Sequence, residues 1–308
     1  MASRAIRNRL KVLLHRAFRL GQRFGIDVLP RHFYSSIPDL RELENDLSWR
    51  NRRSMVGVRG AEIAPQLQFA QQCCSPHREE LLAIDVHRRA VTEADEVGYG
   101  VIEADFLHCF IRTFRPKRII QVGCGVSTAV ILLAAGGRDV QVTCIEPYPS
   151  RFLQRMHQEG RIGLIAQKAQ QVPVERMLQL SAGDLFFVDS THTVKPGSEV
   201  NQIVLEVLPR LTAGVHVHFH DIYFPYDYSR HVFHELFWPN ESVLLHAFLA
   251  GNSGYRISCS LSMLHHAAPA EFERLLPRYQ PAPMDRGLRT AGSEVGHFPS
   301  ATYCMVDG

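Results

Sequence analysis

The sequence lacks several features that would place it in well-known classes of protein. No apolar run approaches the ~20 residues that a membrane-spanning helix needs. The seven cysteines are an odd number and contain no CxxC pair. This pattern argues against a zinc ribbon or a disulfide framework, so we expect reduced thiols and a cytoplasmic location. The chain also has no internal repeat and no low-complexity tract.

An excess of one charge is missing as well. Thirty-four basic and 31 acidic residues give a net charge of +3, too small to predict nucleic-acid binding by the chain as a whole. The 308 residues are 45% hydrophobic and 21% charged. This balance is typical of a globular protein with one large α/β domain and additions, or with two smaller domains.

Acidic residues are absent before Asp27, where seven basic residues and regularly spaced apolar residues predict a basic amphipathic helix within residues 1–27. Such a helix could contact a membrane surface or an acidic partner, or serve as an organellar transit peptide. We favour a helix that packs on the domain with solvated arginines, because amphipathic helices are common in globular proteins. The basic residues are Arg4, Arg7, Arg9, Lys11, Arg16, Arg19 and Arg23.

The rest of the chain divides into a helical N-terminal extension over 28–97 and a domain over 98–308. Short apolar runs alternate with amphipathic segments from residue 98 onward, which predicts βαβ units and a parallel sheet covered by helices. The expected fold is a doubly wound, Rossmann-like, seven-stranded α/β sheet that is mostly parallel and ends in an antiparallel hairpin. The expected strands are 118–124, 139–146, 161–167, 184–190, 214–221, 255–264 and 299–306. The expected helices are 129–135, for which Ser127 or Thr128 can serve as the cap, 150–160, 174–180, 198–211 and segments around 230–250.

A glycine turn follows the first strand. Gly123 and Gly125 form G-x-G between a strand and a helix, where glycine permits a sharp turn and close approach of a ligand. The third position of G-x-G-x-x-G is Thr128, which suits dinucleotide binding less well. Glu146 ends the second strand and can accept hydrogen bonds from ribose hydroxyls. Together these features indicate a ligand that contains adenosine.

Histidine and aspartate follow two further strands. Asp189, Ser190 and His192 follow one strand, and His220 and Asp221 end the next. Because the carboxyl ends of parallel strands share one edge of a sheet, we expect these side chains to meet beside the glycine turn.

The stretch VHVHFHDI contains His216, His218 and His220 at every second position. Since a strand rises ~3.3 Å per residue, His216 and His220 lie roughly 13 Å apart and cannot share a metal ion. We expect His216 and His218 to be packed inside the sheet, and only His220 and Asp221 to reach the strand tip.

The order of the motifs IIQVGCGVST, IEPYP, FFVDSTHTVKPGSEV and HVHFHDIYFPYDY resembles the class I S-adenosylmethionine-dependent methyltransferases, specifically methyltransferase family 24. The similarity covers roughly residues 28–306, and DSTH and HDIYFPY are its most specific parts. It implies that the turn at Gly123 and Gly125 holds the methionine part of S-adenosyl-L-methionine and that Glu146 holds the ribose. The remaining candidate cofactor residues are Tyr99, Gly100, Gln121, Ser127, Gln171 and Asp189. Gln121 and Gln171 stand where the family usually has acids.

The resemblance also implies a small-molecule acceptor, most simply a hydroxyl of a sugar or secondary metabolite. His192 is the first candidate for a general base, followed by His220, and Asp221 completes the catalytic set. Asp189, His220 and Asp221 are candidate ligands for a divalent cation, Mg²⁺ or Mn²⁺. Two alternatives remain open: a nicotinamide-dependent oxidoreductase and a non-catalytic relative that binds the cofactor. A homo-oligomer is compatible with these expectations.

Overall fold

The computed structural model describes residues 4–308, with the side chains of residues 10–283 and 286–308, and divides them into two compact units. The first unit ends at Leu47 and contains α1 (Arg4–Gln22) and α2 (Leu40–Asn45). Helix α1 covers most of the predicted basic helix, whose first three residues lie outside the described part. Within this unit the Asp39 carboxylate accepts a hydrogen bond from the Arg41 backbone N–H and caps α2.

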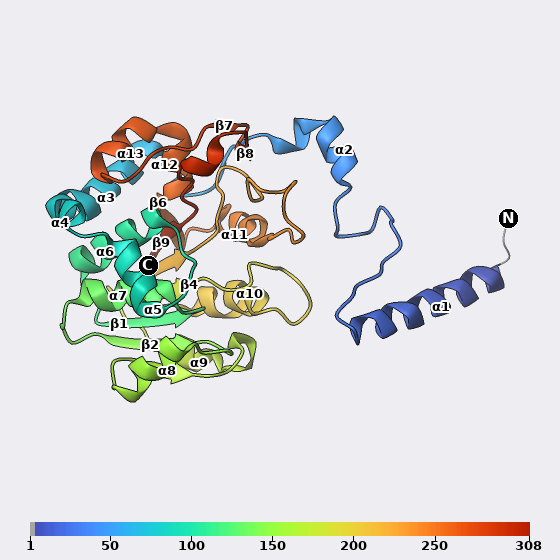
Figure 1. The fold of residues 1–308 in the computed structure, drawn as a ribbon, viewed down its shortest axis with the longest axis horizontal. Coiled ribbons are helices and arrows are strands. Elements are labelled where there is room, and N and C mark those ends of the chain that lie inside the picture. Colours follow the sequence, from blue (N-terminus) through green and yellow to red (C-terminus); the bar gives the residue numbers. More distant parts are fainter. Residues whose placement is uncertain (1–3) are drawn as a thin grey trace. The chain divides into compact units, whose positions relative to one another are not determined.

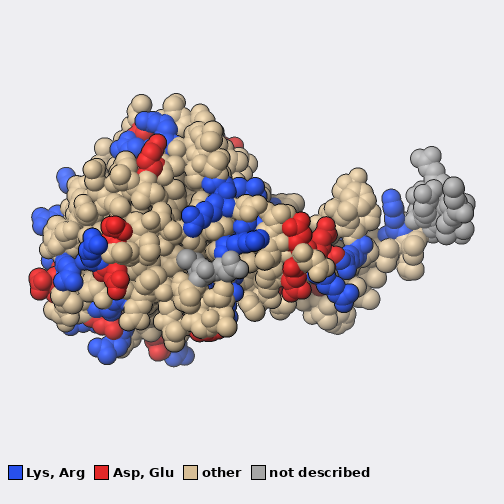
Figure 2. Space-filling view, turned by 90° about the horizontal axis from the view of Figure 1, so that it is seen from above, with Lys and Arg blue, Asp and Glu red and all other residues tan. Residues whose placement is uncertain are grey.

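No helix among residues 4–308 is long and apolar enough to cross a membrane. On the face that Figure 2 shows, basic and acidic side chains lie in separate groups over much of the surface, and the largest group is basic.

The larger unit, Ser48–Gly308, is built on a seven-stranded sheet of order β3-β2-β1-β4-β5-β9-β6 (Figure 1). Strands β1 to β5 are parallel, and β9 pairs antiparallel with both β5 and β6. This arrangement confirms the predicted Rossmann-like sheet with an antiparallel last strand. The strands are β1 (Arg118–Val122), β2 (Gln141–Ile145), β3 (Gly163–Ile165), β4 (Leu185–Val188), β5 (His216–Phe219), β6 (Tyr255–Ser260) and β9 (Thr302–Val306). A separate hairpin pairs β7 (Met284–Asp285) with β8 (Leu288–Arg289).

Alternate residues of the central strands enter two hydrophobic cores, one on each face of the sheet. Leu185 and Phe187 of β4 belong to one core, and Phe186 and Val188 belong to the other. The period of two follows from strand geometry, because successive side chains point to opposite faces. Both faces are therefore buried, which explains why these strands are continuous apolar runs in the sequence.

Helices cover both faces of this sheet (Figure 1). Helices α5, α6 and α7 pack together on one face with α3, while α9 and α11 pack against the helical stretch that begins with α10 on the other. The helices of this unit are η1 (Leu47–Arg50, which begins at the last residue of the first unit), α3 (Ile63–Cys74), η2 (Ser75–His77), α4 (Arg78–Ala83), α5 (Val86–Ala94), α6 (Val101–Phe114), α7 (Val126–Ala135), α8 (Arg151–Gln158), η3 (Ala169–Gln171), α9 (Val174–Met177), α10 (Glu199–Gln202), η4 (Ile203–Val207), η5 (Leu208–Arg210), α11 (Glu241–Leu249), α12 (Leu261–Ala267), α13 (Pro269–Leu275) and η6 (Ser293–Val295).

Several predicted boundaries were wrong, among them those of the strands expected at 161–167 and 299–306, which are Gly163–Ile165 and Thr302–Val306. Two others have a clear local cause. Helix α7 begins at Val126 with Gly125 as its N-cap, so Ser127 and Thr128 lie in the first turn and do not precede the helix. The predicted strand 255–264 ends at Ser260, whose hydroxyl accepts from the Met263 N–H and starts α12. In both places a local capping interaction takes precedence over the apolar pattern.

His216 and His218 are buried in the sheet, as expected from the alternation. The His218 ring stacks on Phe187 at 4.0 Å between ring centroids, and its Nε2 lies 3.2 Å from the Tyr99 hydroxyl. His216 packs against Phe110 and Phe114. Burial lowers the pKa of His216 to about 4, so this imidazole is neutral at neutral pH.

We expect the protein to lose stability as the pH falls below about 6.5, the ordinary pKa of histidine in an unfolded chain. Burial lowers the pKa of His216 to about 4 and those of His265 and His266 to about 3. These imidazoles therefore take up protons more readily in the unfolded chain, and each contributes a loss of about 1–2 kcal/mol between pH 7 and pH 5. Urea unfolding at both pH values measures this loss. His216→Phe should make the decline shallower, and an unchanged pH dependence in this variant would contradict the assignment.

Candidate active site

Gly123 forms the turn at the end of β1 and could not be replaced without displacing its neighbours. Its φ is +78°, and a Cβ at this position would lie 1.6 Å from the carbonyl oxygen of Asp189. The turn is held from both sides, because the Gly123 N–H donates to the Ile145 carbonyl and the Asp189 N–H donates to the Val122 carbonyl. The first glycine thus lets the tips of β1 and β4 approach closely.

Gln121 is fully buried behind this turn and uses both ends of its amide. Its Nε2 donates to the Ser127 hydroxyl at 2.7 Å, and its Oε1 accepts from the Thr128 hydroxyl at 2.8 Å. The Thr128 hydroxyl in turn accepts from the Gly125 N–H at 3.2 Å. This network ties strand β1 to the first turn of α7, so the structure gives the amide of Gln121 a positioning contact that an acid could not fully reproduce.

A cleft of about 550 Å³ opens in front of the turn, lined by residues that include Gly123, Glu146 and Asp189. Glu146 accepts hydrogen bonds from the Tyr148 N–H at 3.0 Å and the Cys124 N–H at 3.4 Å, which orient its carboxylate. Other predicted cofactor residues do not line this cleft: Tyr99, Gly100, Gln121, Gly125, Ser127 and Gln171. Gln170 lines it instead of its neighbour Gln171, which is exposed.

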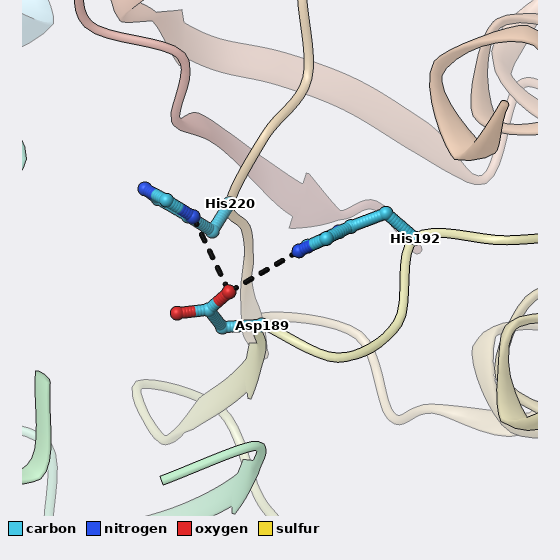
Figure 3. Close-up of side chains that lie close together, drawn as sticks. All are labelled: Asp189, His192 and His220. Carbon is cyan, nitrogen blue, oxygen red and sulfur yellow. Dashed lines mark ion pairs between the residues drawn. The ribbon is translucent and has the colours of Figure 1, made fainter. Parts of the chain in front are cut away.

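Asp189, His192 and His220 meet at the tips of β4 and β5 (Figure 3). The His192 Nε2 lies 3.3 Å, and the His220 Nδ1 3.2 Å, from the same oxygen of Asp189. Figure 3 shows the two imidazoles pointing at this carboxylate from two sides. Glu241 of α11 holds the far nitrogen of His192, with Oε2 2.9 Å from Nδ1.

Asp221 contacts this cluster from the other side. Its Oδ2 lies 3.7 Å from the His192 Nε2 and 3.7 Å from the His220 Nδ1. Its Oδ1 accepts a hydrogen bond from the Ser300 hydroxyl at 2.9 Å. Asp221 is not part of the group that could share one ion, which consists of Asp189, His192 and His220.

The charges in the cluster stabilise one another. Burial favours neutral imidazoles, but the surrounding carboxylates outweigh it, raising the pKa of His220 to about 9 and that of His192 well above its usual range. Burial also favours a neutral carboxyl at Asp189, but the two histidines hold its pKa well below the usual range. Without a cation, the two imidazoles therefore carry the protons that balance the carboxylates.

The residues fit a divalent cation. One ligand atom from each of Asp189, His192 and His220 lies within 4.8 Å of the others, as ligands of a single ion require. The buried Nε2 of His220 has no hydrogen-bond partner among the described residues, so it could serve as a ligand without losing an existing bond, whereas Nδ1 faces Asp189 at 3.2 Å. Two imidazoles and one carboxylate suit manganese, iron or zinc better than magnesium, which prefers oxygen.

A second cleft of about 530 Å³ lies on the Asp221 side. Asp221, Ser300 and Tyr223 line it, together with residues of the 229–235 loop and of the 289–298 segment. Asp189 lines the first cleft and Asp221 lines the second, and His192 and His220 contact both carboxylates. The histidine–aspartate cluster thus forms the boundary between the two clefts.

Three residues of this region have left-handed backbones that are uncommon for side-chain-bearing residues. Tyr99 has φ +52°, His192 +56° and Asp221 +52°. Each such conformation costs on the order of 1 kcal/mol and persists only where the surrounding structure fixes it. At Asp221 the turn directs the chain from β5 into the 222–231 loop while the carboxylate stays beside the cluster.

Several residues of the site were not found from the sequence. Arg50 is buried and donates to the carbonyl oxygens of Tyr228 and Gly287, so it anchors the loop that walls the second cleft. Glu241 and Ser300 contact His192 and Asp221 across 49 and 79 positions of the chain. None belongs to a local motif, so no signal in the sequence alone indicated them.

Comparison with known proteins identifies the central part of this unit. Residues 120–222 match a family model described as a methyltransferase domain. The matched range includes the glycine turn, Glu146 and both strand tips that carry the cluster. This match confirms the resemblance indicated by the motifs. No curated protein matches the sequence at a significant level.

Similar solved structures include cofactor-bound Rv0187 from MTB, with 14% identity over 76% of this chain and 91% of that one and a TM-score of 0.43. The SAH-bound methyltransferase PaMTH1 of Podospora anserina has 14% identity over 89% of this chain and 99% of that one, with a TM-score of 0.40. The plantazolicin methyltransferase BpumL, in complex with a triazolic desmethylPZN analog and SAH, has 10% identity over 80% and 96%, with a TM-score of 0.39.

Proposed function

We propose that the chain is a class I S-adenosylmethionine-dependent methyltransferase and that it transfers a methyl group to a hydroxyl of a small polar molecule. The observation that carries this proposal is the placement of the histidine–aspartate cluster between two clefts. One cleft would hold the cofactor and the other the acceptor. The match of residues 120–222 to a methyltransferase domain also favours this reaction over the nicotinamide-dependent alternative. The free cysteines fit the cytoplasmic location that we propose with it.

The cofactor would occupy the cleft lined by Gly123 and Glu146. S-adenosyl-L-methionine supplies a methyl group on a positively charged sulfur. The Gly123 turn would let the backbone approach the methionine part, and the oriented Glu146 carboxylate would accept hydrogen bonds from the ribose. Glu96 adds a carboxylate next to the turn, since its Oε2 would lie 2.7 Å from a Cβ at Gly125. We propose that Glu96 provides negative charge that Gln121 lacks.

The acceptor hydroxyl would approach the cluster from the Asp221 side. Asp221 is well placed to accept its proton, because one carboxylate oxygen is fixed by Ser300 and the other faces the two histidines. His192, with Glu241 on its far nitrogen, would hold the carboxylates in position. The role of the protein is to align the hydroxyl oxygen with the methyl group at near-attack distance, ~3–3.5 Å.

Asp189, His192 and His220 would hold the divalent cation that we propose, and Asp221 would remain on the acceptor side. Such a cation would favour loss of the hydroxyl proton when the acceptor approaches. Its binding must displace the protons on the two imidazoles, because only neutral imidazole is a ligand. The proposed ligand set thus contains His192 in place of Asp221, which the sequence had suggested. Its two histidines favour Mn²⁺ over Mg²⁺.

Calorimetry tests the cofactor assignment. S-adenosylhomocysteine is expected to bind the wild type, and Glu146→Ala should weaken its binding roughly tenfold or more because the ribose hydroxyls lose a charged acceptor. Glu159→Ala, an exposed acid at the end of α8, is the matched control and should bind normally. Tight NAD binding without a response to S-adenosylhomocysteine would refute the assignment. Binding without turnover over a broad acceptor panel would favour the non-catalytic relative.

Metal removal tests the cation site separately. After treatment with EDTA, Mn²⁺ is expected to raise the melting temperature of the wild type more than Mg²⁺ does, because imidazole is a poor ligand for Mg²⁺. Asp189→Asn should lose most of this rise, since it removes the carboxylate oxygen that both histidines face. Asp139→Asn, an exposed acid before β2, should keep it. An equal rise in wild type and Asp189→Asn would place the cation elsewhere.

A further inference from the structure

The acceptor cleft contains a buried arginine that has no ion-pair partner among the described side chains. Arg230 is 5% exposed and lines the cleft, and it forms no ion pair with any described residue. Its Nε is buried without a hydrogen-bond partner. Its guanidinium lies over the ring of Phe298, at 4.9 Å from the ring centroid. Burying an arginine without an ion-pair partner costs free energy. Its presence in the unliganded protein therefore indicates that an anionic group of the ligand pairs with it.

A second arginine adjoins it. The Arg289 N–H donates to the Arg230 carbonyl at 2.9 Å, which places the two residues side by side at one end of the cleft. Arg289 is paired with the exposed carboxylate of Glu294 at 3.0 Å. That end of the cleft therefore holds two guanidinium groups and one partnered carboxylate, which leaves an excess of positive charge.

The other two acids of the cleft form their contacts with groups other than Arg230. Asp221 contacts His192, His220 and Ser300. Glu235 accepts a hydrogen bond from the Ser229 hydroxyl at 3.1 Å. The second oxygen of Glu235 and the hydroxyl of Ser293 are buried without a partner, as is the Arg230 Nε. The cleft thus presents an unsatisfied guanidinium nitrogen for an anion, and a carboxylate oxygen and a hydroxyl that could bind hydroxyl groups.

We propose that Arg230 and Arg289 bind an anionic group, a carboxylate or a phosphate, of a small hydroxylated acceptor whose reacting hydroxyl faces Asp221. This inference rests on the proposed methyl transfer and names the chemical class of its acceptor. Guanidinium groups recognise both anions through charge-assisted hydrogen bonds. Unsatisfied Glu235 and Ser293 would accept from or donate to further hydroxyls of the same molecule. Fixing the acceptor at its anionic end would hold the reacting hydroxyl at the cluster.

The test measures the melting temperature of the wild type with and without S-adenosylhomocysteine, while phosphate or acetate replaces chloride at constant ionic strength. We expect phosphate, acetate or both to give a saturable rise of about 2–4 °C. The two anions distinguish a phosphate acceptor from a carboxylate acceptor. Arg230→Met should abolish the rise, whereas Arg176→Met, which replaces an exposed arginine of α9 far from the cleft in sequence, should retain it.

Arg289→Met is the second variant, because Arg289 is partly exposed and its loss should leave folding intact. It should weaken the anion response at least roughly fivefold. A response to S-adenosylhomocysteine with no response to either anion would overturn this inference and leave the methyl transfer standing. An anion response that persists in both arginine variants would also overturn it. An anion response without any response to S-adenosylhomocysteine would instead refute the proposed function.

Discussion

Asp221→Asn should lower the rate at which S-adenosylhomocysteine is formed by roughly 10²-fold or more with every acceptor that the wild type methylates. The reason is that the substitution removes the proposed proton acceptor for the hydroxyl. The substitution keeps the shape of the side chain, and the amide oxygen can still accept from Ser300. Affinity for S-adenosylhomocysteine should stay within a few-fold of wild type, since Asp221 lines the acceptor cleft and not the cofactor cleft. Turnover assays and calorimetry measure the two quantities separately.

Asp139→Asn is the control for this variant, because Asp139 is exposed before β2, at the opposite end of the sheet from the cluster. It should behave as wild type in both assays. A fully active Asp221→Asn enzyme would refute the acid–base role of Asp221. Equal losses of turnover and of cofactor affinity would show that Asp221 supports the cofactor cleft, contrary to its placement.

Gly123→Ala should cost about 3 kcal/mol or more of the free energy of unfolding and should abolish cofactor binding. A methyl group at this position would overlap the Asp189 carbonyl, so the tips of β1 and β4 would have to separate. The positive φ of +78° adds a backbone penalty of its own. Because Asp189 belongs to the cluster and lines the cofactor cleft, the separation would disturb both. Urea unfolding measures the loss of stability.

Gly137→Ala separates the two causes. Gly137 has nearly the same φ, +79°, but a Cβ there would meet nothing within 4 Å. It should therefore lose only the backbone contribution, on the order of 1 kcal/mol. Equal losses in the two variants would show that backbone conformation, and not the contact between strand tips, decides the requirement for glycine at 123.

The strands before Gly123 and Asp189 could be predicted from the local pattern of apolar residues. The apolar runs before Gly123 and Asp189 are buried on both faces, and such runs identify strands of a parallel sheet without any knowledge of their neighbours. The boundaries of α7 and β6 did not follow, because capping by Gly125 and by Ser260 depends on hydrogen bonds that the apolar pattern does not encode.

The sequence by itself determined which strands end in histidine or aspartate. Because these strands are parallel, Asp189 and His220 lie at the same edge of the sheet. Only the tertiary structure decided which of these residues form ion pairs with one another. It placed His192 beside Asp189, turned Asp221 toward a second cleft and supplied Glu241 and Ser300 from distant elements. It also left Arg230 buried and unpaired among the described residues. The physical reason is that strand periodicity is local, whereas burial and ion pairing depend on contacts between segments far apart in the chain.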